Sequence, residues 1–342
     1  MQDVKYLIVG QGIAGSMVAW ELLKKKEDFL IISSQTQASS SEIAGGIINP
    51  VNLRKYKLVQ LGDKYMAACN QTYREIEKSL GDKIFHLIDI VKYIDDGLVT
   101  MEVNERLRDY VGHTSMDETI GVKRSDILTL NKTGYLDARL FLTLFRTYLI
   151  RCRKLIQTDF EHGQLTIADS IWHNKIRFQR VIFCEGAHAY ANPWLKSLPF
   201  AHNKGELIEI EAPLLKLDKI IRDEVFILPL GQNRFRIGAT YNHRTINRDP
   251  SDEGRNYLTE KLKKIIDVPY KVIGHDAGIR PSTKDRMPML GALPEYPNIV
   301  VFNGLGSRGF LMAPYWANHL VMWLTGETAQ LNPVVDVNRF LE

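Results

Sequence analysis

Cysteine is scarce in this sequence and forms no recognisable pattern. Three cysteines occur in 342 residues, Cys69, Cys152 and Cys184, and no two of them belong to a C-x-x-C motif. Scattered cysteines of this kind exclude a disulfide framework and a cysteine-rich metal site. We therefore expect all three to be reduced and buried, in the role of small apolar side chains.

Long hydrophobic runs and an excess of charge of one sign are also missing. No apolar stretch approaches the ~18 residues that a membrane-spanning helix needs. The N-terminus leads directly into a predicted strand, without the pattern of a signal peptide. The 44 basic and 40 acidic residues give a net charge of +4, which is too small to indicate nucleic-acid or membrane binding by itself. We expect a cytoplasmic protein with no membrane partner.

What the sequence does contain is a glycine motif between a predicted strand and a predicted helix. The apolar run 6–9 has the length and content of a buried parallel strand, and G-x-G-x-x-G follows it at 10–15. Gly10 allows a tight turn, Gly12 lets a pyrophosphate approach bare backbone, and Gly15 lets the helix pack closely on the strand. This context favours a dinucleotide site over a flexible turn.

The second predicted strand, 29–32, ends without the acidic residue that usually holds the adenosine ribose. Ser33 stands at that position and Ser34 follows it. A serine hydroxyl makes one uncharged contact where a carboxylate makes two, so we expect a weaker ribose contact by one of these serines. The segment 39–50 that follows is rich in small residues, which suit a backbone lying against a flat ring system; an ordinary loop is the alternative.

The middle of the chain combines helices with a second kind of sheet. Helices are predicted over 58–80, 138–149 and 257–266, and strands over 85–93, 181–184, 207–211, 225–228 and 234–240. We also expect a hairpin of 165–167 with 176–180, and connecting structure over 114–131. The later strands indicate an antiparallel sheet separate from the nucleotide-binding one.

The last third repeats the arrangement of strand, glycine loop and helix. The segment 278–285 is expected to be extended, because Pro281 disfavours helix at the residue before it. A strand at 299–302 runs into a glycine loop at 303–310, and a helix is predicted to start near Ala313 with Pro314 in its first turn. Two such loops can bracket one long ligand.

Several short motifs occur together in an order that resembles one family of flavoproteins. They are the glycine motif at 10–15, Ala44-Gly45-Gly46, Glu185-Gly186, Lys204-Gly205-Glu206, Gly278-Ile279-Arg280-Pro281 and the glycine loop at 304–309. Their order and spacing resemble the D-amino-acid oxidase family, which includes glycine oxidase and sarcosine oxidase, over nearly the whole chain. The C-terminal loop with Ala313-Pro314 looks most like the flavin domain of a bifunctional tRNA wobble-uridine modification enzyme, whose methyltransferase domain is absent here.

The resemblance implies an α/β fold (α+β overall) that binds FAD. A Rossmann-like FAD-binding domain would comprise 1–80, 134–203 and 278–342, and a discontinuous antiparallel-sheet substrate domain would comprise 81–133 and 204–277. The implied enzyme oxidises the C–N bond of an amine or amino acid by hydride transfer to flavin N5. Such catalysis needs the substrate carbon held against the ring more than it needs an acid or a base. Relatives that attach flavin covalently use a cysteine in the C-terminal region, and no cysteine follows Cys184, so FAD is expected to be non-covalent.

The resemblance also assigns residues to the substrate. Arg280 matches the arginine that grips the substrate carboxylate, a two-pronged contact that guanidinium geometry favours; a structural ion pair with Asp285 is the alternative. Phe226 replaces a tyrosine that helps to hold the carboxylate in glycine oxidase. Tyr241 stands where a methionine lines the pocket. We therefore expect an amine that carries a carboxylate, without assigning a particular amino acid.

Arg308 is offset by one position from a second active-site arginine of glycine oxidase, which aligns with Ser307. The predicted catalytic residues are Ile47, Phe226, Tyr241, Arg280 and Arg308. The predicted cofactor contacts are Gly10, Gly12, Ile13, Ala14, Gly15, Ser33, Ser34, Ser40, Ser41, Ala44, Gly45, Gly46, Phe160, Glu185, Gly186, Arg280, Gly304, Gly306, Ser307, Arg308, Gly309 and Phe310. No metal ligand is predicted.

Two other functions remain open from the sequence. One is a tRNA-modifying flavoenzyme, in which the lysine- and arginine-rich segments 24–26, 54–57 and 261–264 follow a phosphate backbone; such clusters are usually solvated faces. The other is a dinucleotide-binding protein without catalysis, against which Arg280 argues. The amine, the electron acceptor and the oligomeric state do not follow from the sequence.

Overall fold

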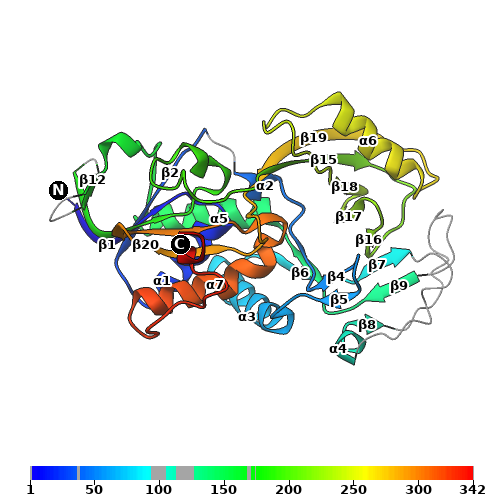
Figure 1. The fold of residues 1–342 in the computed structure, drawn as a ribbon. Coiled ribbons are helices and arrows are strands. Elements are labelled where there is room, and N and C mark those ends of the chain that lie inside the picture. The colour runs from blue at the N-terminus through cyan, green and yellow to red at the C-terminus, as the bar shows by residue number, and fades with distance from the viewer. Residues whose placement is uncertain are drawn as a thin grey trace.

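The computed structural model describes residues 2–36, 39–93, 105–112, 127–167, 171–173 and 175–341. Two eight-stranded sheets lie at opposite ends of the molecule. Figure 1 shows the first sheet with the helices α1 (Ile13–Lys24), α3 (Gly62–Leu80) and α7 (Gly309–Leu324) beside it, and the second sheet under α6 (Asp252–Lys263). The predicted α/β class, with a Rossmann-like part and an antiparallel part, is confirmed.

The first sheet has a parallel centre whose strands end together. In spatial order the parallel strands are β11 (Leu155–Gln157), β2 (Phe29–Ser33), β1 (Gln2–Val9), β14 (Ile176–Phe183) and β21 (Tyr296–Asn303), with β13 (Ile171–His173), β12 (Thr166–Ile167) and β20 (Met289–Leu293) pairing antiparallel at the sides. Val9 lies opposite Ile32 and Phe183, and Phe183 lies opposite Val301. The residues that follow these strands therefore meet at one edge, where ligands of such sheets bind.

The second sheet is mainly antiparallel and has its own apolar core. Its order is β19 (Lys271–Arg280), β15 (Asn203–Glu211), β18 (Arg234–Gly238), β17 (Phe226–Gly231), β16 (Ile220–Arg222), β7 (Ile90–Tyr93), β9 (Ile127–Leu130) and β8 (Val111–Gly112). Leu258 and Leu262 of α6 pack on Ile208, Ile227 and Ile237. The face covered by α6 is thus buried, which leaves the opposite face free to border a site.

Smaller elements join the two sheets. A three-stranded sheet comprises β3 (Ile47–Ile48), β10 (Gly134–Leu136) and β6 (Phe85–Leu87), and β4 (Val51–Asn52) pairs with β5 (Lys57–Leu58). The remaining helices are α2 (Ser40–Ile43), α4 (Glu105–Arg108) and α5 (Ala138–Arg151), with 3₁₀ turns at His162–Gln164, Gly186–Ala191, Gly306–Arg308 and Val337–Phe340. The division of the chain into two domains at the boundaries given above stays a prediction.

Helix α7 starts earlier than its sequence predicts. It begins at Gly309, so Pro314 lies inside it and not in its first turn. A proline removes the bond that its N–H would donate to the carbonyl four residues earlier, which here is that of Phe310. The Tyr73 hydroxyl donates to this carbonyl at 2.6 Å and the Cys69 thiol lies 3.4 Å from it. Helix α3 thereby replaces the lost backbone bond, and the helix continues through the proline.

Several other local predictions were wrong. Residues 57–58 form β5, so the helix predicted from 58 starts at Gly62, and the predicted strand 85–93 is divided into β6 and β7. The predicted hairpin lacked β13, which lies between its two strands. Of the segment 114–131, residues 114–126 lie outside the described part and 127–130 form β9. Cys69 and Cys184 are buried as expected, but Cys152 is exposed. None of the helices in the described ranges is both long and apolar enough to cross a bilayer.

Candidate functional site

A cavity of about 1580 Å³ lies between the carboxyl edge of the first sheet and the uncovered face of the second. It brings together every residue predicted to contact substrate or cofactor except Gly15. Ligand pockets usually have volumes of about 300–1,000 Å³. The cavity therefore has room for a dinucleotide together with a small substrate.

The glycine motif at 10–15 closes one end of this cavity. Gly10 has φ +97°, and a Cβ there would lie 2.6 Å from the carbonyl oxygen of Cys184. A Cβ on Gly15 would lie 1.9 Å from the carbonyl oxygen of Gly10. Both glycines are thus required by the packing of α1 on the sheet, which explains why Gly15 is absent from the cavity wall.

Gly12 differs from these two glycines, because an added Cβ there would approach a serine side chain and no backbone atom. Its φ is −79°, and the nearest atom to an added Cβ is the Ser41 hydroxyl oxygen at 3.3 Å. Gly12 precedes α1 without a capping side chain, so the first N–H groups of the helix are not satisfied in the usual way. One of them, that of Ile13, donates to Ser41 Oγ at 3.2 Å. An uncapped helix N-terminus bordering a cavity is suited to an anion.

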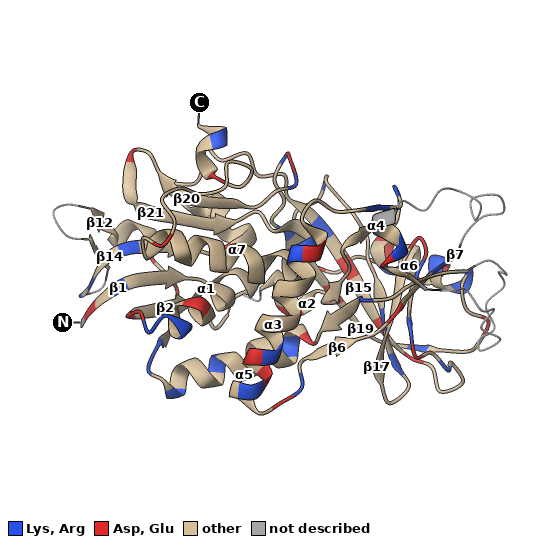
Figure 2. Ribbon diagram, turned by 90° about the horizontal axis from the view of Figure 1, so that it is seen from below, with Lys and Arg blue, Asp and Glu red and all other residues tan. Residues whose placement is uncertain are grey.

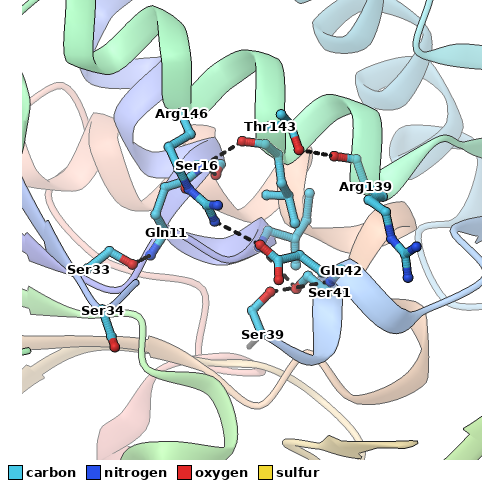
Figure 3. Close-up of polar contacts among 12 residues, drawn as sticks. Gln11, Ser16, Ser33, Ser34, Ser39, Ser41, Glu42, Arg139, Thr143 and Arg146 are labelled. Carbon is cyan, nitrogen blue, oxygen red and sulfur yellow. Dashed lines mark hydrogen bonds and ion pairs between the residues drawn. The ribbon is translucent and has the colours of Figure 1, made fainter. Parts of the chain in front are cut away.

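A polar network behind the glycine motif was not predicted from the sequence. The buried Gln11 accepts from Arg146 Nε at 2.8 Å, and Arg146 Nη2 donates to Glu42 at 2.7 Å. Gln11 N–H donates to the Ser33 hydroxyl at 3.2 Å. Figure 3 shows Arg146 reaching down from α5 to join these groups. The Ser33 hydroxyl keeps its own hydrogen, so it is free to donate to a ligand.

The three serines before Ala44 each make a different contact. Ser39 accepts from Glu42 N–H at 3.3 Å and caps α2, and Ser40 donates to the Ile279 carbonyl at 2.6 Å. With Ser41 bonded to α1, these contacts attach the segment to both sheets. Gly45 follows, and a Cβ on it would lie 2.8 Å from the Phe226 ring. The small residues here are therefore explained in part by close packing within the protein.

The opposite wall is formed by Glu185 and Phe160. The Glu185 carboxylate contacts His162 Nε2 at 2.8 Å and accepts from Asn192 at 2.7 Å, so both of its oxygens have protein partners. Phe160 stacks on His173 with ring centroids 4.0 Å apart. These predicted residues line the cavity, and both Glu185 oxygens are already engaged by protein groups.

A buried asparagine, which the sequence analysis missed, ties the C-terminal glycine loop to the loop after β14. Asn303, at the end of β21, donates to the Gly186 carbonyl at 2.9 Å and accepts from Gly304 N–H at 2.8 Å. Asn303 is 2% exposed. Its amide thereby fixes the loop after β21 against the loop after β14.

Arg280 lies at the far end of the cavity and is not paired with Asp285. Asp285 binds Arg339 at 2.8 Å instead, so the structural alternative considered for Arg280 was wrong. Arg280 Nη1 donates to Asn203 Oδ1 at 2.8 Å and to the Thr240 carbonyl at 3.1 Å. The guanidinium carbon lies 4.1 Å from the centre of the Tyr241 ring. The group is held at one nitrogen and by stacking, while Nη2 and Nε make no hydrogen bond to any residue that the structure describes.

Aromatic side chains border Arg280. Phe226 is buried against Gly45 and Gly238, whereas Tyr241 is 53% exposed. Partial desolvation acts to raise the pKa of Tyr241, but the positive charges of nearby arginines, Arg280 first, and a hydrogen bond with Ser307 together leave that pKa below its ordinary value. Arg222, which the sequence analysis also missed, lines the same cavity. This end of the cavity is therefore strongly cationic.

The predicted basic segments do not form one surface. Lys24 pairs with Glu21 and Glu75, and Lys25 pairs with Glu327. Figure 2 shows basic and acidic segments close together near α1 and α3. Lys261 pairs with Glu224 on the second sheet side. The lysines of 24–26 and 261–264 are thus partly neutralised by acidic neighbours, although Arg54 lines the cavity.

Comparison with known proteins identifies relatives of the whole chain. Glycine oxidase of Bacillus subtilis (strain 168) is 23% identical, with 90% of this chain and 89% of that protein covered. The tRNA 5-methylaminomethyl-2-thiouridine biosynthesis bifunctional protein MnmC of Idiomarina loihiensis is 24% identical over 65% of this chain, which spans only 38% of that protein. The structure of iminodiacetate oxidase from Chelativorans sp. BNC1 has a TM-score of 0.81 at 18% identity, with 96% and 97% of the two chains covered.

The family described as FAD dependent oxidoreductase (DAO) matches residues 5–323. This match covers both glycine loops, both large sheets and Arg280. The chain therefore belongs to the DAO family of FAD-dependent oxidoreductases.

Proposed function

We propose that this flavoenzyme oxidises the C–N bond of a small amine that carries a carboxylate. The observation that carries the proposal is Arg280, a half-buried arginine without a carboxylate partner among the described residues, at the end of the cavity away from the glycine motif. FAD, when bound, accepts the hydride that leaves the substrate carbon. The substrate nitrogen loses a proton, and water hydrolyses the resulting imine to a carbonyl compound and an amine.

The residues of the cavity fit FAD. Gly12 leaves space for a ligand beside the uncapped N-terminus of α1, which suits a pyrophosphate. The Ser33 hydroxyl has a hydrogen to donate to a ribose. Gly45 and Gly46 would border the ring system, and Asn303 would hold the second glycine loop against the same ligand. No cysteine follows Cys184, which supports non-covalent attachment.

In this proposal the protein mainly binds and orients the substrate. Arg280 Nη1 is already occupied, so the remaining N–H groups would receive the carboxylate in a charge-assisted contact. Phe226 would exclude water on the side facing Gly45. Holding the substrate carbon in a fixed position reduces the entropic part of the barrier without a dedicated acid or base.

A reduction assay tests the proposal directly. The purified holoprotein is mixed without oxygen with sarcosine and, as its matched control without a carboxylate, with dimethylamine. We expect sarcosine or another carboxylated amine to bleach the flavin absorbance and dimethylamine to do so far more slowly. If no amine bleaches the flavin, or if dimethylamine reacts as fast as sarcosine, the proposal is wrong.

A tRNA substrate is the second candidate, because exposed basic residues surround the cavity. These are Arg54, Arg244, Lys284 and Arg286. A protein that neutralises several phosphates loses roughly a thousandfold or more in affinity between low and moderate salt. Tight tRNA binding with this salt dependence would favour the tRNA function, and weak or salt-insensitive binding would exclude it.

A further inference from the structure

Arg222 is one of several arginines that line the cavity, and the proposed function gives it no role. It ends β16 and lies opposite Phe226 on β17, which lies opposite Gly238 on β18. Cross-strand partners project from the same face of a sheet. Arg222 therefore projects from the face on which Phe226 contacts Gly45, and it lines the cavity.

The Arg222 guanidinium has no partner that would balance its charge. Among the described residues the Arg222 side chain forms neither a salt bridge nor a hydrogen bond, and the like charge of Arg54 acts on it. Glu224 also lines the cavity but pairs with Lys261. Burial lowers the pKa of Arg222. Because a desolvated charge without a partner is unfavourable, an anion from a ligand would complete this position.

Arg222 and Arg280 approach one space from opposite sides. Their strands, β16 and β19, are separated by three others in the sheet, which corresponds to about 19 Å at the usual spacing of strands. Both positive charges nevertheless act on Tyr241, and Arg222 acts on Arg280. Both arginines line the same cavity, so two residues this far apart at the backbone border one ligand space.

We infer that Arg222 forms a second anion-binding position, so that the substrate is a small amine with two acidic groups, one at Arg280 and one at Arg222. This inference rests on the proposed function, since it takes amine oxidation as the reaction. A carboxylate and a phosphonate or phosphate share the charge and the oxygen geometry that a guanidinium binds. The experiment below separates these two sources of the second group.

Binding of unreactive anions tests Arg222 without requiring turnover. Holoprotein is titrated by calorimetry with acetate, malonate, succinate, glutarate and phosphonoacetate. The variants are Arg222→Gln, Arg222→Lys and Arg280→Met, with Arg180→Met as the control. Arg180 is a suitable control because it stacks on Trp323 at 5.2 Å and does not line the cavity.

The wild-type protein is expected to bind the best-fitting diacid about 30-fold more tightly than acetate, the gain of one additional charge-assisted contact. Arg222→Gln should abolish this preference for diacids while its affinity for acetate stays within about 3-fold of the wild-type value. Arg222→Lys should retain part of the preference because the positive charge remains. Arg280→Met should weaken all the anions, whereas Arg180→Met should change none. Tighter binding of phosphonoacetate than of any dicarboxylate would identify the second group as phosphate-like.

Several results would overturn the inference. One is equal affinity of the wild type for acetate and every diacid. The others are an unchanged preference for diacids in Arg222→Gln, or an equal loss of affinity for acetate and for diacids in that variant. If Arg222→Gln fails to fold, the wild-type preference and Arg222→Lys still decide.

Kinetics with iminodiacetate and sarcosine separates this failure from failure of the proposed function. If the protein oxidises sarcosine, and the Arg222 variants oxidise iminodiacetate as well as the wild type does, only the inference about Arg222 is wrong. A diacid preference that depends on Arg222, without oxidation of any amine, removes the proposed function and leaves Arg222 as an anion-binding position for another ligand.

Discussion

Replacement of Arg280 by methionine is expected to weaken the enzyme for its carboxylated substrate while leaving FAD in place. In the structure Arg280 Nη1 donates to Asn203 and to the Thr240 carbonyl, so the side chain is positioned before substrate arrives. A hydrogen bond to a charged group contributes about 1.5–3 kcal/mol, and removing one partner leaves the other desolvated. We therefore expect a loss of about 2–4 kcal/mol in kcat/KM, or about 30- to 1,000-fold.

The loss should appear mostly in KM. A contact made equally in the ground state and the transition state changes KM more than kcat. Arg280→Lys keeps the positive charge but not the planar fork, so it should recover only part of the activity. Steady-state kinetics with the amine identified by the reduction assay measures both variants, and Arg180→Met should behave as wild type.

Flavin content decides whether Arg280 acts on the substrate. The visible spectrum and the ratio of flavin to protein should be unchanged in both variants, because Arg280 is assigned to the substrate in this proposal. Loss of FAD or of folded protein in Arg280→Met would make the residue structural. Unchanged kinetics with a carboxylated amine would refute the assignment equally.

Three further predictions concern the cofactor and stability. Gly12→Val should fold but bind little FAD, whereas Gly15→Ala should fail to fold. Circular dichroism measures the folding and the flavin absorbance measures the FAD content. A Gly12→Val protein that retained full FAD would contradict the assignment of Gly12 to the pyrophosphate. Tyr73→Phe should lower the free energy of unfolding, measured with denaturant, by about 1–3 kcal/mol. The same substitution should lower it clearly less in a Pro314→Ala background, where the backbone N–H at 314 can donate to the Phe310 carbonyl. An equal loss in the two backgrounds would refute this explanation. Glu206→Gln should lose about 3–5 kcal/mol at pH 7, because the ion pair that it breaks is buried. Burial acts to raise the pKa of Glu206, but hydrogen bonds outweigh it and hold that pKa below its ordinary value. The stability that the ionised Glu206 contributes is therefore fully present above the pKa of about 4.3 of an unfolded glutamate, and it is lost as the pH falls further. The melting temperatures of the wild type and Glu206→Gln, measured between pH 3 and 7, should therefore converge at acid pH. A difference that stays constant over this range would contradict the role given to the Glu206 carboxylate.

The local parts of the fold were predictable because their signals are local. The strand, glycine turn and helix at 6–24 have contiguous patterns, and Gly15 is required by a contact within that same unit, although the close neighbour of Gly10 is the carbonyl of Cys184. The extended conformation predicted for 278–285 from Pro281 is confirmed only up to Arg280, where β19 ends, and residues 284–285 form a turn. Such features depend on a few neighbouring residues, so reading the chain in order is sufficient.

Other features were invisible in the sequence because their causes lie far away in the chain. Pro314 indicated a helix start, yet the Tyr73 hydroxyl, 237 residues before its acceptor Phe310, allows the helix to pass through. Arg146 has the appearance of an exposed helix residue, but it binds Gln11 from 135 residues away.

The same distinction holds for the site. The sequence by itself determined the flavoprotein architecture, the two glycine loops and Arg280. Only the tertiary structure decided that Asp285 binds Arg339 and not Arg280, and that Arg222 enters the same cavity. The partner of a charged side chain depends on which strands become neighbours, and in the second sheet β15 lies between β19 and β18, so the order of the strands in space differs from their order in the chain. The charges that face a substrate are therefore fixed by strand pairing, which no local pattern records.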